Sequence, residues 1–205
     1  MRSGTLSLSF LFFVLLSASA AQTRSLPVEV FFSPDGGCTE AVVLSLKAAK
    51  KSVYVQAYSF TSSPIAKALV DAHRRNVKVS VVLDDSQRSE KYSSADFLNN
   101  AGVIPQIDSR HAIAHNKVMI IDEQTVITGS FNFTKAAEER NAENLLIIND
   151  KDIAAKYLRN WQQHAAHAEG YVRTTSGSKT GKGPKLKAPS REESRWSRFF
   201  QDLMK

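Results

Sequence analysis

The chain has 205 residues, a formal net charge of +7 and a single cysteine, Cys38. This length supplies one substantial core and excludes two large ones, and a single cysteine excludes an internal disulfide, so Cys38 is expected as a small apolar residue near the core. Residues 21–172 hold 17 basic and 17 acidic residues, a net charge of zero, whereas residues 173–205 hold nine basic and three acidic, a net charge of +6. The high pI is therefore a property of the C-terminal segment and does not indicate a basic groove in the core.

The first 21 residues have the three-part plan of a secretory signal peptide. Arg2 gives a positive start, residues 6–16 form an apolar run, and Ala18-Ser19-Ala20 provides the small residues of a cleavage site. The run of eleven residues is too short to span a bilayer, which needs about 20. We expect residues 1–21 to be removed, which predicts an exported protein, periplasmic or secreted, with no stable membrane span in its mature form. The alternative is an uncleaved N-terminal anchor.

Residues 22–172 carry strand and helix patterns that follow one another as in a single domain. In chain order the patterns predict strand 28–32, helix 41–51, strand 52–58, a helix opening at Ser62-Ser63-Pro64, strand 77–83, helix 94–101 and strand 104–107. The second half then predicts a hairpin of strands 117–121 and 126–128 around turn 122–125, strand 145–148 and a closing helix 150–167. The alternation in the first half predicts an α/β fold, a mixed and largely parallel sheet flanked by helices.

The composition changes after residue 172. Residues 173–189 are rich in Ser, Gly, Pro and Lys, which predicts a basic flexible linker. Residues 190–205 open with the capping box Ser190 and Glu193. An apolar stripe at helical spacing follows on Trp196, Phe199, Phe200, Leu203 and Met204. This predicts an amphipathic C-terminal helix, and three surfaces compete for it: the protein's own core or its dimer mate, a partner's groove, and an anionic membrane.

One segment of the second half concentrates residues that suit phosphodiester chemistry. His115 and Lys117 are two apart on a strand and therefore point to the same side. A neutral imidazole is a nucleophile, and a fixed ammonium neutralises charge that develops on phosphate oxygens. Ser130 and Asn132, again two apart, would place a hydroxyl and an amide toward the same anion. Glu143 precedes an apolar strand, where it would hold the unreactive ring nitrogen of His115 and set its tautomer.

These residues resemble a known family. His115-Asn116-Lys117 followed by Asp122 fits H-x-K-x4-D, the signature of the phospholipase D superfamily. Residues 129–138, Gly-Ser-Phe-Asn-Phe-Thr-Lys-Ala-Ala-Glu, and residues 57–61, Ala-Tyr-Ser-Phe-Thr, resemble its short bacterial endonuclease branch, known as Nuc. The resemblance covers nearly the whole of domain 22–172 and excludes the C-terminal segment. Asn116 departs from the acidic residue expected in close relatives, at a position outside the signature.

The resemblance implies a phospholipase D-like sandwich with one motif per chain, no cofactor and a homodimer. In-line displacement through a covalent intermediate needs a nucleophile on one side of phosphorus and an acid on the other, and one histidine cannot be both at once. His115 of one chain would form phosphohistidine, and His115 of its mate would protonate the leaving group. Lys117, Ser130 and Asn132 of both chains would hold the phosphate.

These implications predict a metal-independent phosphodiesterase, most directly a nonspecific DNA endonuclease, with RNA left open as a further substrate. Two other function classes stay open. A phospholipase D-type hydrolase of phospholipid head groups would use the same residues, because the chemistry reads only the phosphodiester. A noncatalytic nucleic-acid-binding protein is disfavoured, because every position of the motif is intact.

The other titratable residues predict structural roles. Asp122 falls in the hairpin turn, where it would either orient the site or support it structurally. Asp84-Asp85 ends a strand and is interpreted as a cap for the next turn. His111 is expected in a loop, and solvated or half-buried helix faces are expected for His73, His164 and His167. No cluster in this interpretation reaches three ligands, so no metal is predicted.

Overall fold

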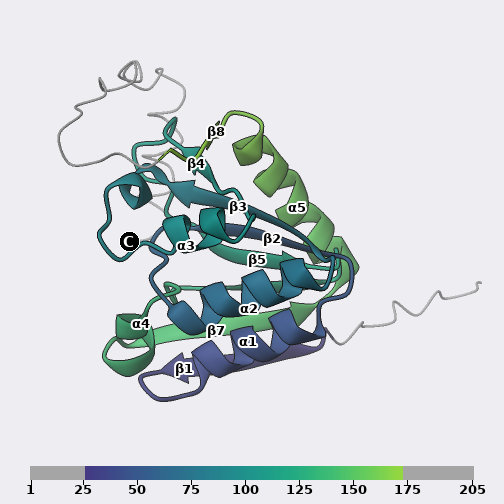
Figure 1. The fold of residues 1–205 in the computed structure, drawn as a ribbon. Coiled ribbons are helices and arrows are strands. Elements are labelled where there is room, and N and C mark those ends of the chain that lie inside the picture. Colours follow the sequence, from purple (N-terminus) through teal and green to yellow (C-terminus); the bar gives the residue numbers. More distant parts are fainter. Residues whose placement is uncertain (1–25, 173–205) are drawn as a thin grey trace, which may run out of the picture.

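The structure, a computed structural model, describes residues 26–172. They form one eight-stranded sheet with the order β1-β7-β6-β5-β2-β3-β4-β8 (Figure 1). The strands are β1 (Val28–Ser33), β2 (Ser52–Ala57), β3 (Lys78–Asp84), β4 (Gln106–Asp108), β5 (Lys117–Ile121), β6 (Thr125–Gly129), β7 (Glu143–Asn149) and β8 (Glu169–Gly170). Within residues 26–172, no helix has the length and apolar character needed to cross a bilayer. The signal peptide, linker and C-terminal helix expected at residues 1–21, 173–189 and 190–205 lie outside the described residues.

The sheet is mixed, as expected, but the prediction that it is largely parallel is wrong. Parallel pairing is confined to β2-β3 and β3-β4. The pairs β1-β7, β7-β6, β6-β5, β5-β2 and β4-β8 are antiparallel. The strand order explains the difference. β1 and β2 run in the same direction, but β5, β6 and β7 lie between them and turn what would be one parallel contact into four antiparallel ones.

Helices cover both faces of the sheet, which confirms the flanked α/β architecture. They are α1 (Cys38–Ala48), α2 (Ser63–Arg74), α3 (Ala95–Asn100), α4 (Lys135–Glu139) and α5 (Lys151–Ala165), with a 3-10 turn η1 (Asp85–Arg88). Helices α1 and α2 pack side by side on one face, and α5 crosses the other (Figure 1). Cys38 is fully buried at the start of α1. Burial, with the nearby Glu138 carboxylate, raises the pKa of its thiol to about 11, so it behaves as the expected small core residue.

Strand β2 is the centre of both core layers. Its successive side chains point to opposite faces: Val55 joins the core under α1 and α2, and Tyr54 joins the core under α5. Trp161 of α5 packs on Tyr54 with ring centroids 5.0 Å apart and donates its indole N–H to the Val55 carbonyl oxygen at 2.8 Å. This anchors α5 across β2. Ala57, the last residue of β2, pairs with Lys117, the first residue of β5. The chain therefore leaves β2 and enters β5 at the same edge of the sheet, formed by these two strand ends.

Candidate active site

His115 and Lys117, which the sequence pattern places on the same side of a strand, lie next to each other at this edge. Lys117 is the first residue of β5 and only 7% exposed, whereas His115 precedes the strand and is exposed. The Lys117 Nζ donates a hydrogen bond to the His115 carbonyl oxygen at 2.7 Å and lies 3.0 Å from Nδ1 of the His115 ring. The amine is therefore held in place, while the imidazole stays accessible to a substrate.

The contact with Lys117 sets the tautomer of His115 in the single chain. A protonated lysine has no lone pair, so Nδ1 accepts and the proton of a neutral ring sits on Nε2. Attack by Nε2 needs the other tautomer, with an acceptor beside Nδ1. The sequence predicts Glu143 as that acceptor, but its carboxylate accepts a hydrogen bond from Asn141 at 3.2 Å and none from His115. The single chain does not make this contact, because Glu143 begins β7 and β6 lies between β7 and β5.

Glu143 acts on Lys117 through its charge instead. Burial lowers the pKa of Lys117, and the Glu143 carboxylate offsets part of this effect by raising it. Since a lysine must keep its proton to hold a phosphate electrostatically, Glu143 supports the cationic form of Lys117.

Tyr58 is a site residue that the sequence did not single out. It directly follows β2, and its backbone N–H donates to the Asn116 carbonyl oxygen at 2.9 Å, which extends the pairing with the segment before β5. Its ring centroid lies 4.5 Å from that of His115 and 5.1 Å from the Lys117 Nζ. The ring therefore flanks the imidazole and adds a cation–π contact to the ammonium. Its position in the Ala-Tyr-Ser-Phe-Thr stretch was the available signal.

Ser130 and Asn132 lie on a segment that its buried neighbours hold in place. Phe131 and Phe133 are fully buried, so the side chains that alternate with them point away from that core. The Phe133 carbonyl oxygen accepts hydrogen bonds from both backbone N–H groups of Thr61-Ser62, at 3.0 and 2.9 Å. These bonds tie the segment to the chain that follows Tyr58.

Gly129 allows this segment to turn against β7. Its φ is 145°, and a Cβ there would lie 2.3 Å from the carbonyl oxygen of Asn144, so only glycine fits. The next residue, Ser130, accepts a hydrogen bond on Oγ from the Asn144 backbone N–H at 3.1 Å. Because the hydroxyl accepts there, its own proton stays available for a phosphate oxygen.

Asn132 carries a buried polar atom without a partner. Its Oδ1 makes no hydrogen bond with any part of residues 26–172. An unpaired buried acceptor costs about 1–3 kcal/mol, and such a cost is typical of a functional position. Asn132 and Tyr58 both line an open groove of about 780 Å³. The amide nitrogen of Asn132, not the Oδ1 acceptor, is the group suited to donate a hydrogen bond to a phosphate oxygen at this groove.

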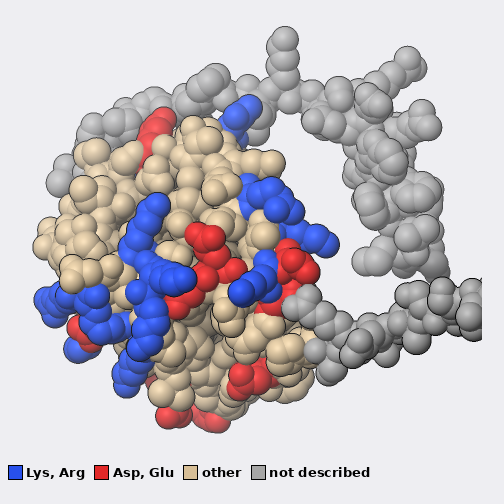
Figure 2. All heavy atoms as spheres, turned by 90° about the vertical axis from the view of Figure 1, so that its right-hand side faces the viewer, with Lys and Arg blue, Asp and Glu red and all other residues tan. Residues whose placement is uncertain are grey.

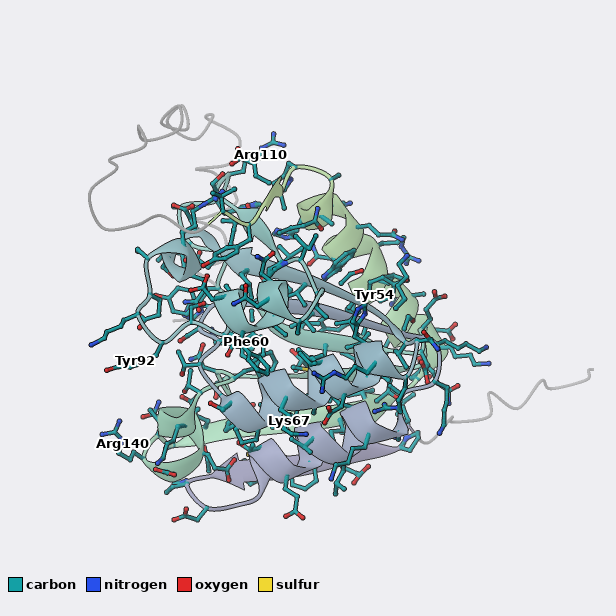
Figure 3. The ribbon with its side chains drawn as sticks, viewed as in Figure 1. Tyr54, Phe60, Lys67, Tyr92, Arg110 and Arg140 are labelled. Atoms are coloured by element: carbon teal, nitrogen blue, oxygen red, sulfur yellow. The ribbon has the colours of Figure 1, made fainter. Side chains whose placement is uncertain are left out.

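The rim of this groove is polar and partly basic. Thr134, Lys135, Arg140 and the exposed Tyr92 contribute to it. Tyr92 and Arg140 lie at the same edge of the molecule (Figure 3). On the opposite side of the molecule, acidic and basic side chains lie next to one another (Figure 2), so that face is not a uniformly basic surface.

Comparison with known proteins decides the family. Residues 42–165, more than half of the chain, match the family described as cardiolipin synthase, PLD-like domain. The chain belongs to the phospholipase D superfamily. It is a phosphodiester hydrolase of that superfamily, as its motif predicts.

Relatives of this superfamily member carry both lipid and Nuc names. Phospholipase D from Rickettsia typhi is 48% identical over 134 residues, which cover 65% of this chain and 66% of that protein. Mitochondrial cardiolipin hydrolase from Xenopus laevis is 32% identical over 122 residues, 60% of this chain and 58% of its own. The chain thus matches about two thirds or less of the length of these two relatives.

The solved structures confirm the resemblance to the Nuc-type branch. The phospholipase D family member Nuc from Salmonella typhimurium is 40% identical, with a TM-score of 0.69, and the match covers 72% of this chain and 99% of that one. NucT from Helicobacter pylori is 24% identical, with a TM-score of 0.66 and coverage of 72% and 100%. The second match shows the fold alone.

The third residue of the phospholipase D signature, Asp122, lies at the far end of β5, ~16 Å along the strand from Lys117. Its carboxylate accepts hydrogen bonds from the backbone N–H groups of residues 50–52 at 2.6–3.2 Å. Burial raises the pKa of Asp122, but these hydrogen bonds outweigh it and the net shift is downward. Of the two roles expected for Asp122, these contacts favour the structural one: its carboxylate ties the β5–β6 turn to the start of β2. Asp suits the turn because its φ is 53°.

Asp84 holds the chain just before His115. One oxygen of its carboxylate accepts from the Ser86 N–H at 3.0 Å, which confirms the cap expected from the sequence. The other accepts from the backbone N–H of Ala114 at 2.7 Å. This second bond joins positions 30 residues apart, so it depends on the fold.

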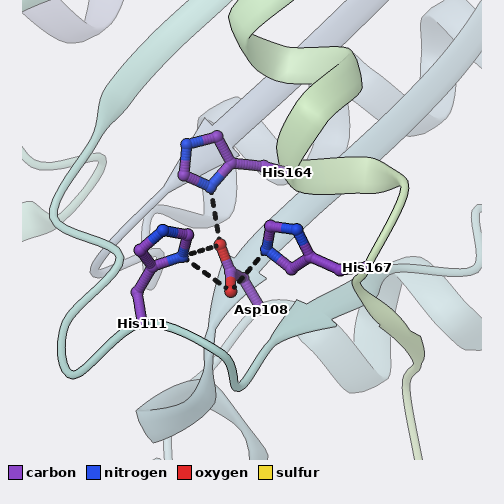
Figure 4. A group of neighbouring side chains, drawn as sticks. All are labelled: Asp108, His111, His164 and His167. Atoms are coloured by element: carbon purple, nitrogen blue, oxygen red, sulfur yellow. Dashed lines mark hydrogen bonds and ion pairs between the residues drawn. The ribbon is translucent and has the colours of Figure 1, made fainter. Parts of the chain in front are cut away.

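Three histidines expected on separate surfaces meet at one carboxylate (Figure 4). Asp108 is fully buried, and its oxygens lie within 3.1 Å of a ring nitrogen of each of His111, His164 and His167. These four residues, the Asp108 cluster, offer one ligand atom each, all within 4.8 Å of one another. The prediction that no cluster reaches three ligands is wrong. The i, i+3 spacing within each pair was visible in the sequence, but the meeting of two pairs from distant segments was not.

Proposed function

We propose that this phospholipase D superfamily hydrolase is a metal-independent, nonspecific DNA endonuclease that acts through phosphohistidine at a site shared by two chains. The observation that carries the proposal is the exposed His115 ring, held by Lys117 and Tyr58. It lies at the edge of the sheet where Tyr58 and the unsatisfied Asn132 line an open groove. These groups supply a nucleophile, a cation and polar contacts to a phosphodiester that enters from outside.

The reaction proceeds in two displacements. His115 of one chain attacks phosphorus, and a P–N bond forms as the P–O bond to the leaving group breaks. His115 of the second chain protonates the leaving oxygen and then takes a proton from the water that attacks the phosphohistidine. Lys117, Ser130 and Asn132 bind the nonbridging oxygens. The nucleophile and the protonated acid both carry a proton on Nδ1, so each His115 ring needs an acceptor there in place of the Lys117 amine, and Glu143 is proposed for this role in the dimer.

An exposed apolar stripe supports the homodimer. Val28, Val30 and Phe32 of the edge strand β1 are 41%, 51% and 66% exposed. They alternate with Phe31, which packs on the core under α1 and α2, so they lie on the other face of the sheet. The stripe ends where β1 pairs with Glu143. A second chain over this stripe would cover the end of β1 that pairs with the start of β7, where Glu143 lies.

The groups of the site act on the phosphodiester itself, so the same chemistry suits both DNA and a phospholipid. The relatives named phospholipase D and cardiolipin hydrolase favour a lipid. We place nucleic acid first for two reasons. The rim of the groove carries hydroxyl and amide side chains and two cations, Lys135 and Arg140, against one acidic residue, Glu90, and the match to Nuc covers 99% of that chain.

The decisive experiment compares substrates with a chelator present. The full chain and its His115→Ala variant are assayed on supercoiled plasmid DNA and on phosphatidylcholine and cardiolipin vesicles, each with excess EDTA. We expect the unaltered chain to cleave plasmid DNA and the His115→Ala variant not to cleave it. Cleavage of lipid without cleavage of DNA supports the phospholipase alternative, and DNA binding without cleavage of either supports a noncatalytic binding protein. Loss of activity in EDTA that Mg²⁺ restores would contradict the mechanism.

A mixing experiment tests the shared site. Equal amounts of unaltered and His115→Ala chains are co-refolded, so that about one quarter of the dimers carry two intact histidines. Compared with a sample of the same total number of chains, all unaltered, a shared site predicts about one quarter of the activity, whereas independent sites predict about one half. The rate should also show a bell-shaped dependence on pH, because one neutral and one protonated imidazole are needed together.

Export is proposed from residues 1–21. N-terminal sequencing of the protein recovered from the periplasm or medium should begin near residue 22. Recovery of the intact N-terminus in the membrane fraction instead would support the uncleaved anchor.

A further inference from the structure

The Asp108 cluster joins three separate parts of the fold at one point. Asp108 is in β4, and His111 is in the loop that runs from β4 to His115. His164 lies in the last turn of α5, and His167 just beyond it. The side chains of His164 and His167 are 13% and 20% exposed, and that of His111 is 44% exposed. The cluster is therefore shielded on the side of His164 and His167. The more exposed His111 side chain leaves a path by which an ion can enter.

We propose that the Asp108 cluster is a binding site for one divalent transition metal ion, with Zn²⁺ as the ion that fits it best. Three imidazoles and one carboxylate are N and O donors of the kind that zinc takes, and four protein ligands make the closed tetrahedral shell of a structural site. The site is separate from His115, and no step of phosphodiester cleavage passes through it.

The spacing of the donors requires only a small adjustment. The three ring nitrogens lie 2.6–3.1 Å from the nearest Asp108 oxygen. Zn–N and Zn–O distances of about 2.0–2.2 Å in a tetrahedron place neighbouring donors roughly 3.3–3.6 Å apart. The rings must therefore move away from the carboxylate by less than about 1 Å, and the farther donor pairs, now within 4.8 Å, must close by up to about 1.5 Å. Rotation about the histidine side-chain bonds supplies movements of this size.

The charge of the cluster also suits a cation. The Asp108 carboxylate is fully buried, and a ring nitrogen of each of the three histidines lies within 3.1 Å of it. Without an ion, three ring nitrogens must all point protons at this one side chain, with ring centroids only 4.7–5.7 Å apart. On binding an ion, each neutral ring would carry its proton on the nitrogen that faces away from Asp108, and the freed lone pair on the near nitrogen would be the ligand.

The place of the cluster indicates what the ion does. His111 lies in the loop of residues 109–114, and Ala114 at its other end is held by Asp84. An ion bound to the cluster would fasten that loop to α5, and the loop leads directly to His115. The expected role is to stabilise the segment that carries the catalytic histidine. The plain alternative is that the histidines hold Asp108 by hydrogen bonds alone.

The test uses the full chain, freed of metal with a chelator and dialysed. Zn²⁺ and Co²⁺ are titrated, with bound metal measured by elemental analysis and Co²⁺ by its visible absorption, which reports a tetrahedral site. One ion per chain is expected. At a Zn²⁺ concentration of about 100 times Kd, Tm should rise by about 5–10 °C.

Four variants separate the alternatives. His164→Gln keeps an N–H donor toward Asp108 but loses the metal ligand, so it should abolish the Zn²⁺-induced rise in Tm while still cleaving plasmid DNA. If that variant fails to fold, His111→Ala in the exposed loop serves the same purpose. His73→Gln in α2 and His115→Ala should bind Zn²⁺ as the unaltered chain does. Absence of bound metal, or an equal rise in Tm for His164→Gln and the unaltered chain, would overturn the proposal.

Discussion

The two ends of strand β5 use residues of one motif in opposite ways. At the Ile121 end, the Asp122 carboxylate accepts hydrogen bonds from three consecutive backbone N–H groups. At the Lys117 end, the His115 ring is exposed, and the buried Asn132 Oδ1 has no hydrogen-bond partner among residues 26–172. Saturated polar groups stabilise a fold, whereas unsatisfied ones are available to a substrate. The signature therefore joins a chemical half to a structural half through one short strand.

The largest expected effect is at the chemical end. His115→Ala should reduce the rate of plasmid cleavage by at least about 10³-fold, because the nucleophile and the acid are both lost from the dimer. Tm should stay within about 2 °C, since the ring is exposed. Cleavage rates and thermal unfolding measure the two effects. His73→Ala is the matched control, and substantial activity in His115→Ala would show that another residue attacks phosphorus.

Asn132→Ala sharpens the same contrast. Activity should fall by about 10- to 100-fold, because a polar contact to the phosphate is lost. The free energy of unfolding should stay unchanged or rise by up to about 1 kcal/mol, because the unpaired buried oxygen is removed. Urea unfolding and single-turnover cleavage give the two values. Asn160→Ala on the exposed surface of α5 is the control, and a variant with lower stability and full activity would place Asn132 among the structural residues.

At the Asp122 end of β5, a substitution should lower stability and leave activity nearly unchanged. Asp122→Asn keeps a residue that tolerates the left-handed backbone of the turn but loses the charge that receives the backbone N–H groups. The free energy of unfolding should fall by about 2 kcal/mol, while the cleavage rate of folded protein at 20 °C changes by less than about twofold. Glu123→Gln in the same turn is the control. A selective loss of activity in Asp122→Asn would return Asp122 to the catalytic group.

The smallest expected effect is the pH dependence of the difference in unfolding free energy between the unaltered chain and Asp122→Asn. The pKa of Asp122 is below its ordinary value of 3.8 in the folded chain, so its contribution is complete above 3.8 and disappears as the pH falls through the folded value. The gap in unfolding free energy between the unaltered chain and Asp122→Asn should therefore be constant from pH 7 to 5 and narrow below 3.8. Urea unfolding at a series of pH values measures it, and a gap that widens in acid would contradict the assignment.

Most individual elements could be predicted from the sequence. The alternation around Val53 and Val55 predicted β2, Pro64 marked the start of α2, and the polar turn at residues 122–125 marked the β5–β6 hairpin. These predictions rest on short-range periodicity and turn chemistry, which act within a few residues. The family and the nearness of His115 to Lys117 followed in the same way, because the whole motif lies in one short segment.

What only the tertiary structure decided depends on which strands are neighbours. Periodicity reports which side of a strand is buried, but it does not report what lies beside that strand. The insertion of β5, β6 and β7 between β1 and β2 therefore made the sheet mainly antiparallel and kept Glu143 from His115. The meeting of His111 with His164 and His167 around Asp108 depends on α5 crossing the sheet to β4. Such contacts join segments more than 50 residues apart, and local sequence carries no record of the distance between them.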